Sequence, residues 1–281
     1  MKTRSAIRIL AAIPLIALAL GACAHADPWA RGDDRFRVAL TSAWTVSNAV
    51  YDNSRDTQGL PANIKRVDML VYYDAGFSNK TQLSIEAGYT RSYPGYAQAG
   101  VVSSGNPGAA DIWIRHKWQF RDQSLDAALL SGFKIPGSYD RHVLNRSGEA
   151  QTDIELGLSA GQQVPHNGAY WSVDAIHRWR LSHAPNQAEF RAALGRTFGP
   201  WNARMTWKKI ESLGGYDLTD TPWGGGALRF TGVEADSDTG LLDLEYRFSP
   251  RRALAVGYAD TLAGKNALDS RAWSLSYIMD H

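Results

Sequence analysis

Apolar and polar side chains alternate along much of this chain. From Val67 to Phe77 the odd-numbered positions are apolar or aromatic, whereas Asp68 and Asp74 occupy even-numbered ones. Successive side chains of a β-strand point to opposite faces, so a period of two predicts a strand with one apolar and one polar face. The chain is therefore expected to be rich in such strands.

The same alternation recurs to the end of the chain and predicts about twelve strands. The alternating positions fall within 36–46, 67–77, 82–90, 111–120, 125–135, 153–160, 171–179, 190–194, 201–207, 242–248, 254–258 and 273–279. A tilted strand crosses a bilayer with roughly 9–11 residues, and most of these segments come near that length. Long strands with little helical pattern favour a barrel that spans a membrane.

The connections between the predicted strands alternate in length. Short ones are expected at 78–81, 121–124, 162–169, 198–200 and 249–252, long ones at 52–63, 92–109, 136–150 and 211–237, and intermediate ones at 182–187 and 261–269. Outer-membrane barrels have short turns in the periplasm and longer loops outside. An even number of strands places both chain ends on the periplasmic side.

Two kinds of barrel fit this alternation. A soluble, lipocalin-like barrel buries its apolar faces, whereas a membrane barrel turns them toward lipid. The predicted apolar faces carry tryptophans near strand ends, as aromatic girdles do: Trp118, Trp171, Trp179, Trp201, Trp207 and Trp273. Small soluble barrels rarely need twelve strands. We therefore predict an all-β, antiparallel, up-and-down transmembrane β-barrel.

The composition agrees with this fold class. The chain has 281 residues with 10 Trp, 12 Tyr and 26 Gly, and a net charge of +2 that gives no indication of nucleic-acid binding. Its one cysteine is Cys23, so residues 27–281 offer neither a disulfide nor a thiolate metal site. The glycine-rich segment 223–230 lacks the strand-then-helix context of a phosphate-binding loop, and no cofactor is expected.

The N-terminal region has the pattern of an export signal. Basic residues precede the apolar run from Ile9 to Leu20, which is too short to span a membrane as a helix. The sequence LGACAHADP allows two outcomes: lipidation at Cys23, or cleavage after Ala26. A barrel is held in the membrane by its own apolar band, so cleavage is favoured. Residues 1–26 are then the signal peptide and residues 27–281 the barrel.

Several segments resemble the bacterial outer-membrane family of phenol-degradation meta-pathway proteins. They are NPGAADIWIRHKWQF (106–120), ALLSGFKIPGS (128–138), SGEAQTDIELGLSAGQ (147–162) and WSVDAIHRWR (171–180). The resemblance implies a transporter-like barrel that passes aromatic or other hydrophobic compounds. Two places depart from the family pattern: Ala109-Ala110 replaces the glycine before Asp111, and Gly137-Ser138 replaces Thr-Gly.

The predicted polar faces carry charged residues that would line the lumen. The candidates for a permeation path are Arg115, Lys117, Lys134, Asp153, Glu155, Asp174, Arg178, Arg191, Arg204 and Glu245. One interpretation is structural, with Asp153 and Glu155 forming ion pairs with Lys134 on the adjacent strand. The other is functional, with the basic residues weakly favouring anions or aromatic carboxylates.

An enzyme is the alternative class of function. Barrel lipid hydrolases use a histidine with Ser, Asn or Asp near the outer rim, and two predicted outer loops hold such residues: Ser182, His183 and Asn186 in one, His142 and Ser147 in the other. Neither group forms a recognisable motif. His116 and His177 are expected on the lipid face, and no pair of histidines has useful spacing for a metal. A structural or adhesive barrel is a third class.

These observations lead to a functional hypothesis. A twelve-strand barrel lies between filled eight-strand barrels and open sixteen-strand porins, so its pore should be narrow or filled. We expect an outer-membrane channel, surrounded by lipid, that passes small hydrophobic or aromatic molecules. The loops at 92–109 and 211–237 would act as its gate. The number of subunits is left open.

The processing site can be tested directly. Mass spectrometry of the protein purified from membranes should find a mature N-terminus at Asp27, because the A-x-A site precedes it. A mature chain that begins with a diacylglyceryl group on Cys23 would contradict this expectation.

Overall fold

The computed structural model of the protein describes residues 29–52, 54–93, 106–121, 125–138, 151–165, 167–181, 185–214, 236–265 and 267–281. These residues form the strands β1 (Phe36–Tyr51), β2 (Thr57–Gly76), β3 (Thr81–Tyr93), β4 (Asn106–Ala109), β5 (Ile112–Arg121), β6 (Asp126–Ile135), β7 (Asp153–Gln163), β8 (Ala169–Arg180), β9 (Asn186–Phe198), β10 (Trp201–Leu213), β11 (Asp236–Ser249), β12 (Arg252–Lys265) and β13 (Ala267–Asp280). In this part of the chain no helix is long and apolar enough to span a membrane.

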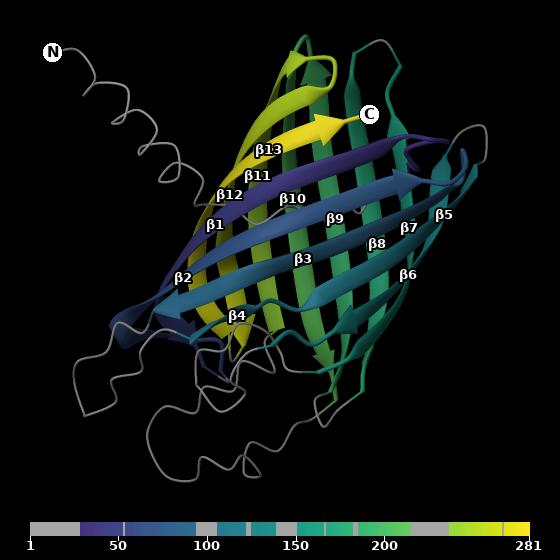
Figure 1. Ribbon diagram of the computed structural model, residues 1–281. Helices are drawn as coiled ribbons and strands as arrows, with labels where there is room; N and C mark the ends of the chain where they lie inside the picture. Colours follow the sequence, from purple (N-terminus) through teal and green to yellow (C-terminus); the bar gives the residue numbers. More distant parts are fainter. Residues whose placement is uncertain are drawn as a thin grey trace, which may run out of the picture.

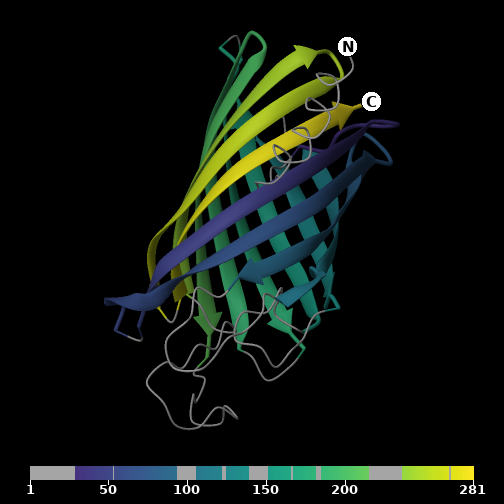
Figure 2. The same cartoon turned by 60° about the vertical axis from the view of Figure 1, so that its left-hand side comes forward.

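The strands close into a single antiparallel barrel (Figures 1 and 2). Each barrel strand pairs with its neighbours in sequence, and β1 closes the ring by pairing with β13 from Arg37↔Asp280 to Tyr51↔Ala267. The short strand β4 and strand β5 together occupy one place beside β3, because they pair with different parts of it. The barrel therefore has twelve strand positions, which confirms the predicted all-β architecture.

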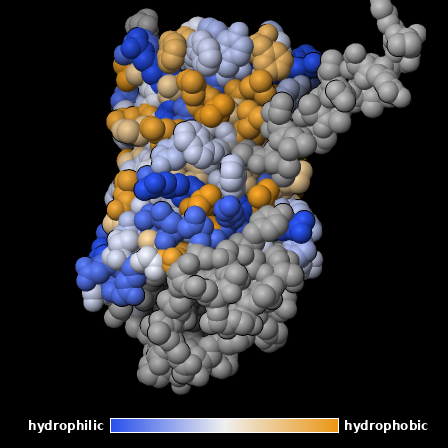
Figure 3. Space-filling view, turned by 90° about the vertical axis from the view of Figure 1, so that its left-hand side faces the viewer, coloured by the Kyte–Doolittle hydropathy of each residue, from blue (hydrophilic) through white to orange (hydrophobic). Residues whose placement is uncertain are grey.

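Polar side chains fill the inside of the barrel and apolar ones cover its outside. In β7, Asp153, Glu155 and Ser159 are buried, whereas Leu156 and Leu158 are 44% and 58% exposed. A soluble protein would show the opposite arrangement, since exposed leucines face water at a cost and buried charges need compensation. The outer surface is thus built to face lipid, and the lipocalin-like alternative does not apply. Figure 3 shows apolar side chains gathered on the outer wall toward the end that holds the C-terminus.

Aromatic side chains form two bands on the outer face. Toward the end where β1 begins and β13 ends, Trp201 packs on Tyr246 with ring centroids 4.6 Å apart. Toward the other end, Trp273 contacts Tyr258 at 4.6 Å and stands opposite Trp44 in the β1–β13 ladder. Amphipathic rings favour the two interfaces of a bilayer, so these bands mark its approximate position on the barrel.

The connections define two ends of the barrel. The "turn end" carries the connections 77–80, 122–125, 164–168, 199–200 and 250–251 together with the first and last strand ends, and the "loop end" carries the others. Figure 1 shows the C-terminus at the turn end, at the top of the view. Much of the predicted loops 92–109, 136–150 and 211–237 lies outside the described residues.

Three predicted connections are wrong in extent. The long loop expected at 52–63 is reduced to residues 52–56, and the connection expected at 261–269 to position 266, since the flanking strands continue. The loop expected at 92–109 contains β4 at its end. Beyond the bilayer a strand needs no apolar face, so alternation fades there while backbone pairing continues. In the first hairpin, Asp52 accepts the N–H groups of Ser54 and Asp56 at 2.7 and 2.9 Å and closes the turn.

The inside-out arrangement predicts that introducing an arginine costs more stability on the outer face than on the inner face. Leu158→Arg places a cation in the lipid band and should reduce the free energy of unfolding by about 2–4 kcal/mol. Ser274→Arg, on the inward face of β13, should cost clearly less because its side chain meets the polar lumen. Urea titration of each variant in lipid vesicles measures the difference, and equal losses for the two variants would contradict the assigned faces.

Candidate functional site: the barrel lumen

All ten charged residues selected from the sequence lie on the inside of the barrel. Six are buried there: Lys117, Lys134, Asp153, Glu155, Asp174 and Arg178. The other four line internal cavities: Arg115, Arg191, Arg204 and Glu245. The strand pleat places them there, because each follows the polar parity of its strand. They do not form one site but fall into groups at different heights of the lumen.

The group nearest the loop end surrounds a buried lysine. Lys134 of β6, 1% exposed, meets Asp153 of β7 at 2.5 Å and Asp111 at 3.8 Å. Gln151 donates to Asp153 at 3.0 Å, and the Arg180 guanidinium lies 4.0 Å from the same carboxylate. A charge buried this deeply is tolerated only when it is paired and hydrogen-bonded, so this group holds β5 to β8 together.

The middle group is centred on Glu155. This carboxylate accepts hydrogen bonds from Arg115 at 3.1 Å and from Arg178 at 2.7 and 2.9 Å, and does not serve as the partner expected for Lys134. Arg178 also donates to Glu189 at 3.0 Å, and Glu189 is paired in turn with Arg191. The residues come from β5, β7, β8 and β9 and form a ladder of opposite charges from β5 to β9, in which Gly132 of β6 stands between Arg115 and Glu155.

An inward-facing tryptophan packs against this ladder. The guanidinium carbons of Arg115 and Arg178 lie 4.2 and 4.9 Å from the ring centre of Trp113, and the Lys134 ammonium lies 5.4 Å from it. Cations at these distances are attracted by the face of an indole ring. The alternation places Trp113 on the polar face, but the sequence alone does not show which cations its ring meets there.

A third group lies at the turn end and crosses the seam between the first and last strands. Arg37 of β1 forms two hydrogen bonds with Asp280 of β13, at 2.7 and 3.0 Å. Arg247 meets both Asp280 and Glu245 at 2.8 Å. One strand further on, Arg204 contacts Asp243 at 2.9 Å. Paired side chains thus join the two strands that close the barrel, in addition to their backbone ladder.

The first described residues of the chain enter the lumen. Residues 29–33, here called the N-terminal strap, run inside the turn end of the barrel. Trp29 donates its indole N–H to Asp126 at 2.7 Å and accepts from Lys117 at 3.3 Å through its carbonyl oxygen. The backbone N–H of Arg31 donates to Gln82 at 3.0 Å, and its guanidinium contacts Asp74. Nothing in the alternation of the sequence predicts this placement, because the strap is not a strand.

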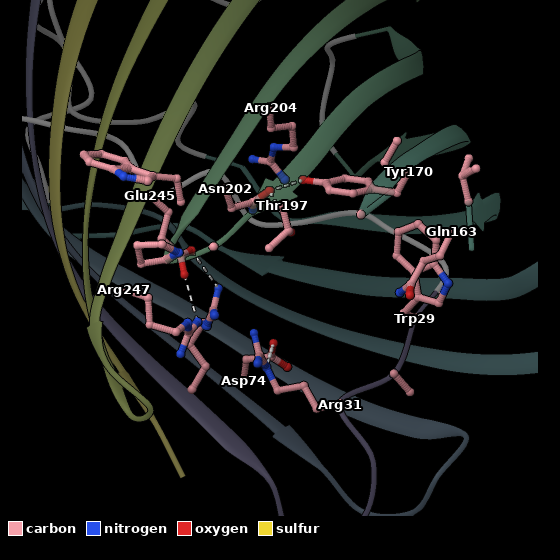
Figure 4. A pocket seen from close by; sticks show the side chains of 18 of the residues that line it. Trp29, Arg31, Asp74, Gln163, Tyr170, Thr197, Asn202, Arg204, Glu245 and Arg247 are labelled. Atoms are coloured by element: carbon pink, nitrogen blue, oxygen red, sulfur yellow. Dashed lines mark hydrogen bonds and ion pairs between the residues drawn. The ribbon is translucent and has the colours of Figure 1, made fainter. Parts of the chain in front are cut away.

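Among the residues that the structure describes, two larger cavities lie inside the barrel, besides a small one of about 40 Å³ beside Glu155. The "turn-end cavity", of about 610 Å³, lies between the strap and strands β8 to β11, as Figure 4 shows with Trp29 and Tyr170 on its wall. The "central cavity", of about 320 Å³, is lined by residues from several strands around the barrel, which include Glu86 of β3, Arg191 of β9 and Lys208 of β10. Arg204 lines both cavities, so they adjoin at this residue.

The structure describes only some of the residues that were considered as candidates for a lipid hydrolase. His142, Ser147, Ser182 and His183 lie outside the described residues, as does Cys23. The side-chain oxygen of Asn186 accepts the backbone N–H of Arg180 at 3.1 Å. His177 lies on the outer face, where its ring contacts Trp179 at 4.4 Å. Among the residues that the structure describes, no cluster of His, Cys, Asp and Glu is arranged to hold a metal ion.

Comparison with known proteins supports the fold. No family model matches the chain, and no curated protein does. The structure is similar to an outer-membrane channel from Pseudomonas putida F1, with a TM-score of 0.71 and 10% identity over 92% of this chain and 99% of that one. It also resembles the NanC porin, with a TM-score of 0.55 and 7% identity over 86% of this chain and 98% of that one. Similarity at these identities establishes the outer-membrane barrel fold, and the family suggested by the sequence stays a prediction.

The buried pair of Lys134 and Asp153 predicts a strong effect of removing one partner. Asp153→Asn removes the nearer carboxylate partner of Lys134, keeps Asp111 at 3.8 Å, and should reduce the free energy of unfolding by about 3–5 kcal/mol. The double variant Lys134→Met/Asp153→Asn removes both charges and should recover part of that loss. Urea titration in lipid vesicles measures both, and a double variant less stable than Asp153→Asn would show that the pair does not act as described.

Proposed function

We propose that this protein is an outer-membrane channel that passes small, hydrophobic or aromatic molecules. The observation that carries the proposal is the pair of adjoining cavities inside a barrel whose outer face is apolar. A barrel with a fully packed interior would leave no path for a solute. The similarity in fold to an outer-membrane channel over nearly the whole chain adds support. The turn end then faces the periplasm, as short turns do in such barrels.

The lumen is charged but internally compensated. The basic residues named above face carboxylates: Arg115 and Arg178 face Glu155, Lys134 faces Asp153, and Arg204 faces Asp243. An ion that enters such a lumen meets groups whose charges already neutralise one another, so the preference for anions over cations should be weak. This favours passage of small uncharged molecules over selection of ions.

The central cavity has the size and lining for small solutes. Its volume of about 320 Å³ lies at the lower end of the range of small-molecule sites. Small apolar side chains line part of it, among them Ala43, Ala193 and Ala259, next to the charged groups. Such a mixed lining accepts molecules with an apolar body and a polar group.

The conductance of the purified full chain in planar bilayers tests the proposal. Thr206 lines the central cavity, whereas its neighbour Met205 is 55% exposed on the outer face. Thr206→Trp fills part of the path and should lower the single-channel conductance about twofold or more. Met205→Trp is the matched control on the lipid face and should conduct like the wild type.

Two results would contradict the channel. One is a correctly folded wild-type barrel without conductance, together with unchanged uptake of small aromatic compounds on deletion of the gene. The other is equal conductance in both tryptophan variants, which would place the path elsewhere. Hydrolysis of membrane lipid that is lost in His183→Ala or His142→Ala would favour the enzyme alternative. The absence of both conductance and hydrolysis would favour a structural barrel.

A further inference from the structure

We propose that the N-terminal strap and the facing wall of β8 to β10 form a binding site in the turn-end cavity for a small, planar, uncharged molecule with a hydrogen-bonding group. This inference rests on the proposed channel function and specifies where a solute pauses before release. It assigns a role to a segment that precedes the first strand. The site consists of Trp29 on the strap, Tyr170 on β8 and Asn202 on β10.

The strap is seated by contacts to several strands. Trp29 is bound to Asp126 of β6, the N–H of Ala30 donates to Gln119 of β5 at 2.8 Å, and Arg31 contacts Asp74 of β2 and, at 3.5 Å, Asp280 of β13. Contacts to opposite sides of the ring hold the strap across one part of the opening. A segment with so many directed hydrogen bonds is a fixed wall of the cavity.

The barrel wall is shaped to receive the strap. Gly32 has a φ of +86°, a conformation that favours glycine. At Gly76, at the end of β2, a Cβ atom would come within 1.8 Å of the Gly32 carbonyl oxygen. Any larger residue at position 76 would therefore push the strap away from the wall. Two glycines in contact thus permit the close approach.

The two aromatic rings contact each other at one corner of the cavity. Trp29 and Tyr170 meet edge to face, with ring centres 5.8 Å apart and planes at 87°. Tyr170 lies over Gly195, where an added Cβ would be 2.1 Å from the ring, and its hydroxyl donates to Asn202 at 3.3 Å. Both rings are held in place by groups other than a ligand, so they form a preorganised apolar surface for a planar molecule.

The charges around the cavity favour an uncharged ligand. The guanidinium groups that line it come from Arg31, Arg37, Arg204 and Arg247. Their carboxylate partners are Asp74, Asp280, Asp243 and Glu245, all within hydrogen-bonding distance of them. An anion would have to compete with these carboxylates for the guanidinium groups, whereas a neutral amide or hydroxyl need not break an ion pair. The amides and hydroxyls of Gln82, Gln163, Thr197 and Asn202 line the same space.

Calorimetric titration of the folded full chain in detergent tests the site without reference to conductance. The probes are benzamide, which is planar and uncharged, and benzoate, which has the same shape and a negative charge. Benzamide should bind more tightly than benzoate. Trp29→Ala and Tyr170→Ala should each weaken benzamide binding about tenfold, because each removes one ring of the surface.

Two control variants make the titration specific. Trp171 is next to Tyr170 but lies on the lipid-facing side of β8, so Trp171→Ala should bind benzamide like the wild type. Trp29→Phe keeps a ring while losing the hydrogen bond to Asp126, and should retain most of the affinity. Each variant is first checked for the heat-dependent gel mobility of a folded barrel, and an alanine variant that fails this check is replaced by the leucine variant at the same position, which also lacks the aromatic ring.

The outcomes separate this site from the channel itself. Equal benzamide binding by wild type, Trp29→Ala and Tyr170→Ala, or tighter binding of benzoate than of benzamide, would overturn the proposed site even if the barrel conducts. No benzamide binding by the wild type would overturn it as well. Specific benzamide binding by a barrel that does not conduct would uphold the site and contradict the channel.

Discussion

The mutual neutralisation of charges inside a shell of lipid is the constraint on which this structure depends. The outer face of each strand is apolar because it meets hydrocarbon, so the polar face has to point inward. Side chains as buried as Lys134 and Asp153, 1% and 0% exposed, then need opposite charges within reach. Nearby strands provide these partners, and the ladder from Arg115 through Glu155 and Arg178 to Glu189 is the result.

The same constraint determines how much open space remains inside the barrel. Paired side chains lean against the wall of β5 to β9, and the strap occupies the turn end beside β2 to β6. The two cavities occupy the space that these groups leave free, with Arg204 lining both. The barrel is therefore neither empty nor filled. Its free path is narrow because ion pairs and one inserted segment take up much of the interior, which agrees with passage of small molecules and not of large ones.

Much of the fold could be predicted from the sequence, because each strand carries its own alternation. Ile154, Leu156 and Leu158 on one face and Asp153 and Glu155 on the other predict β7 and its orientation in lipid without reference to any other strand. The extensions of β1, β2, β12 and β13 could not be predicted, since their outer parts lie beyond the bilayer and have no apolar face.

The candidate site was less accessible to prediction for a related reason. Strand parity places Arg178 in the lumen, but its choice of Glu155 and Glu189 as partners depends on the register between strands. A single sequence does not determine that register. The position of Trp29 could not be predicted from the sequence either. It is set by contacts with Asp126 and Tyr170, which are about a hundred or more positions away in the chain. A short segment without alternation gives no indication of such contacts.

The most direct test of the account is whether water reaches the inside of the barrel at mid-height. The chain has one cysteine, in the N-terminal region, so a cysteine introduced into the barrel can be followed on its own once Cys23 is replaced or removed. Labelling of Thr206→Cys and Met205→Cys with a charged, membrane-impermeant maleimide in lipid vesicles makes the measurement. The account predicts fast labelling at position 206 and protection at position 205. Protection at both positions would mean a closed lumen, and the reverse pattern would mean that the two faces have been assigned the wrong way round.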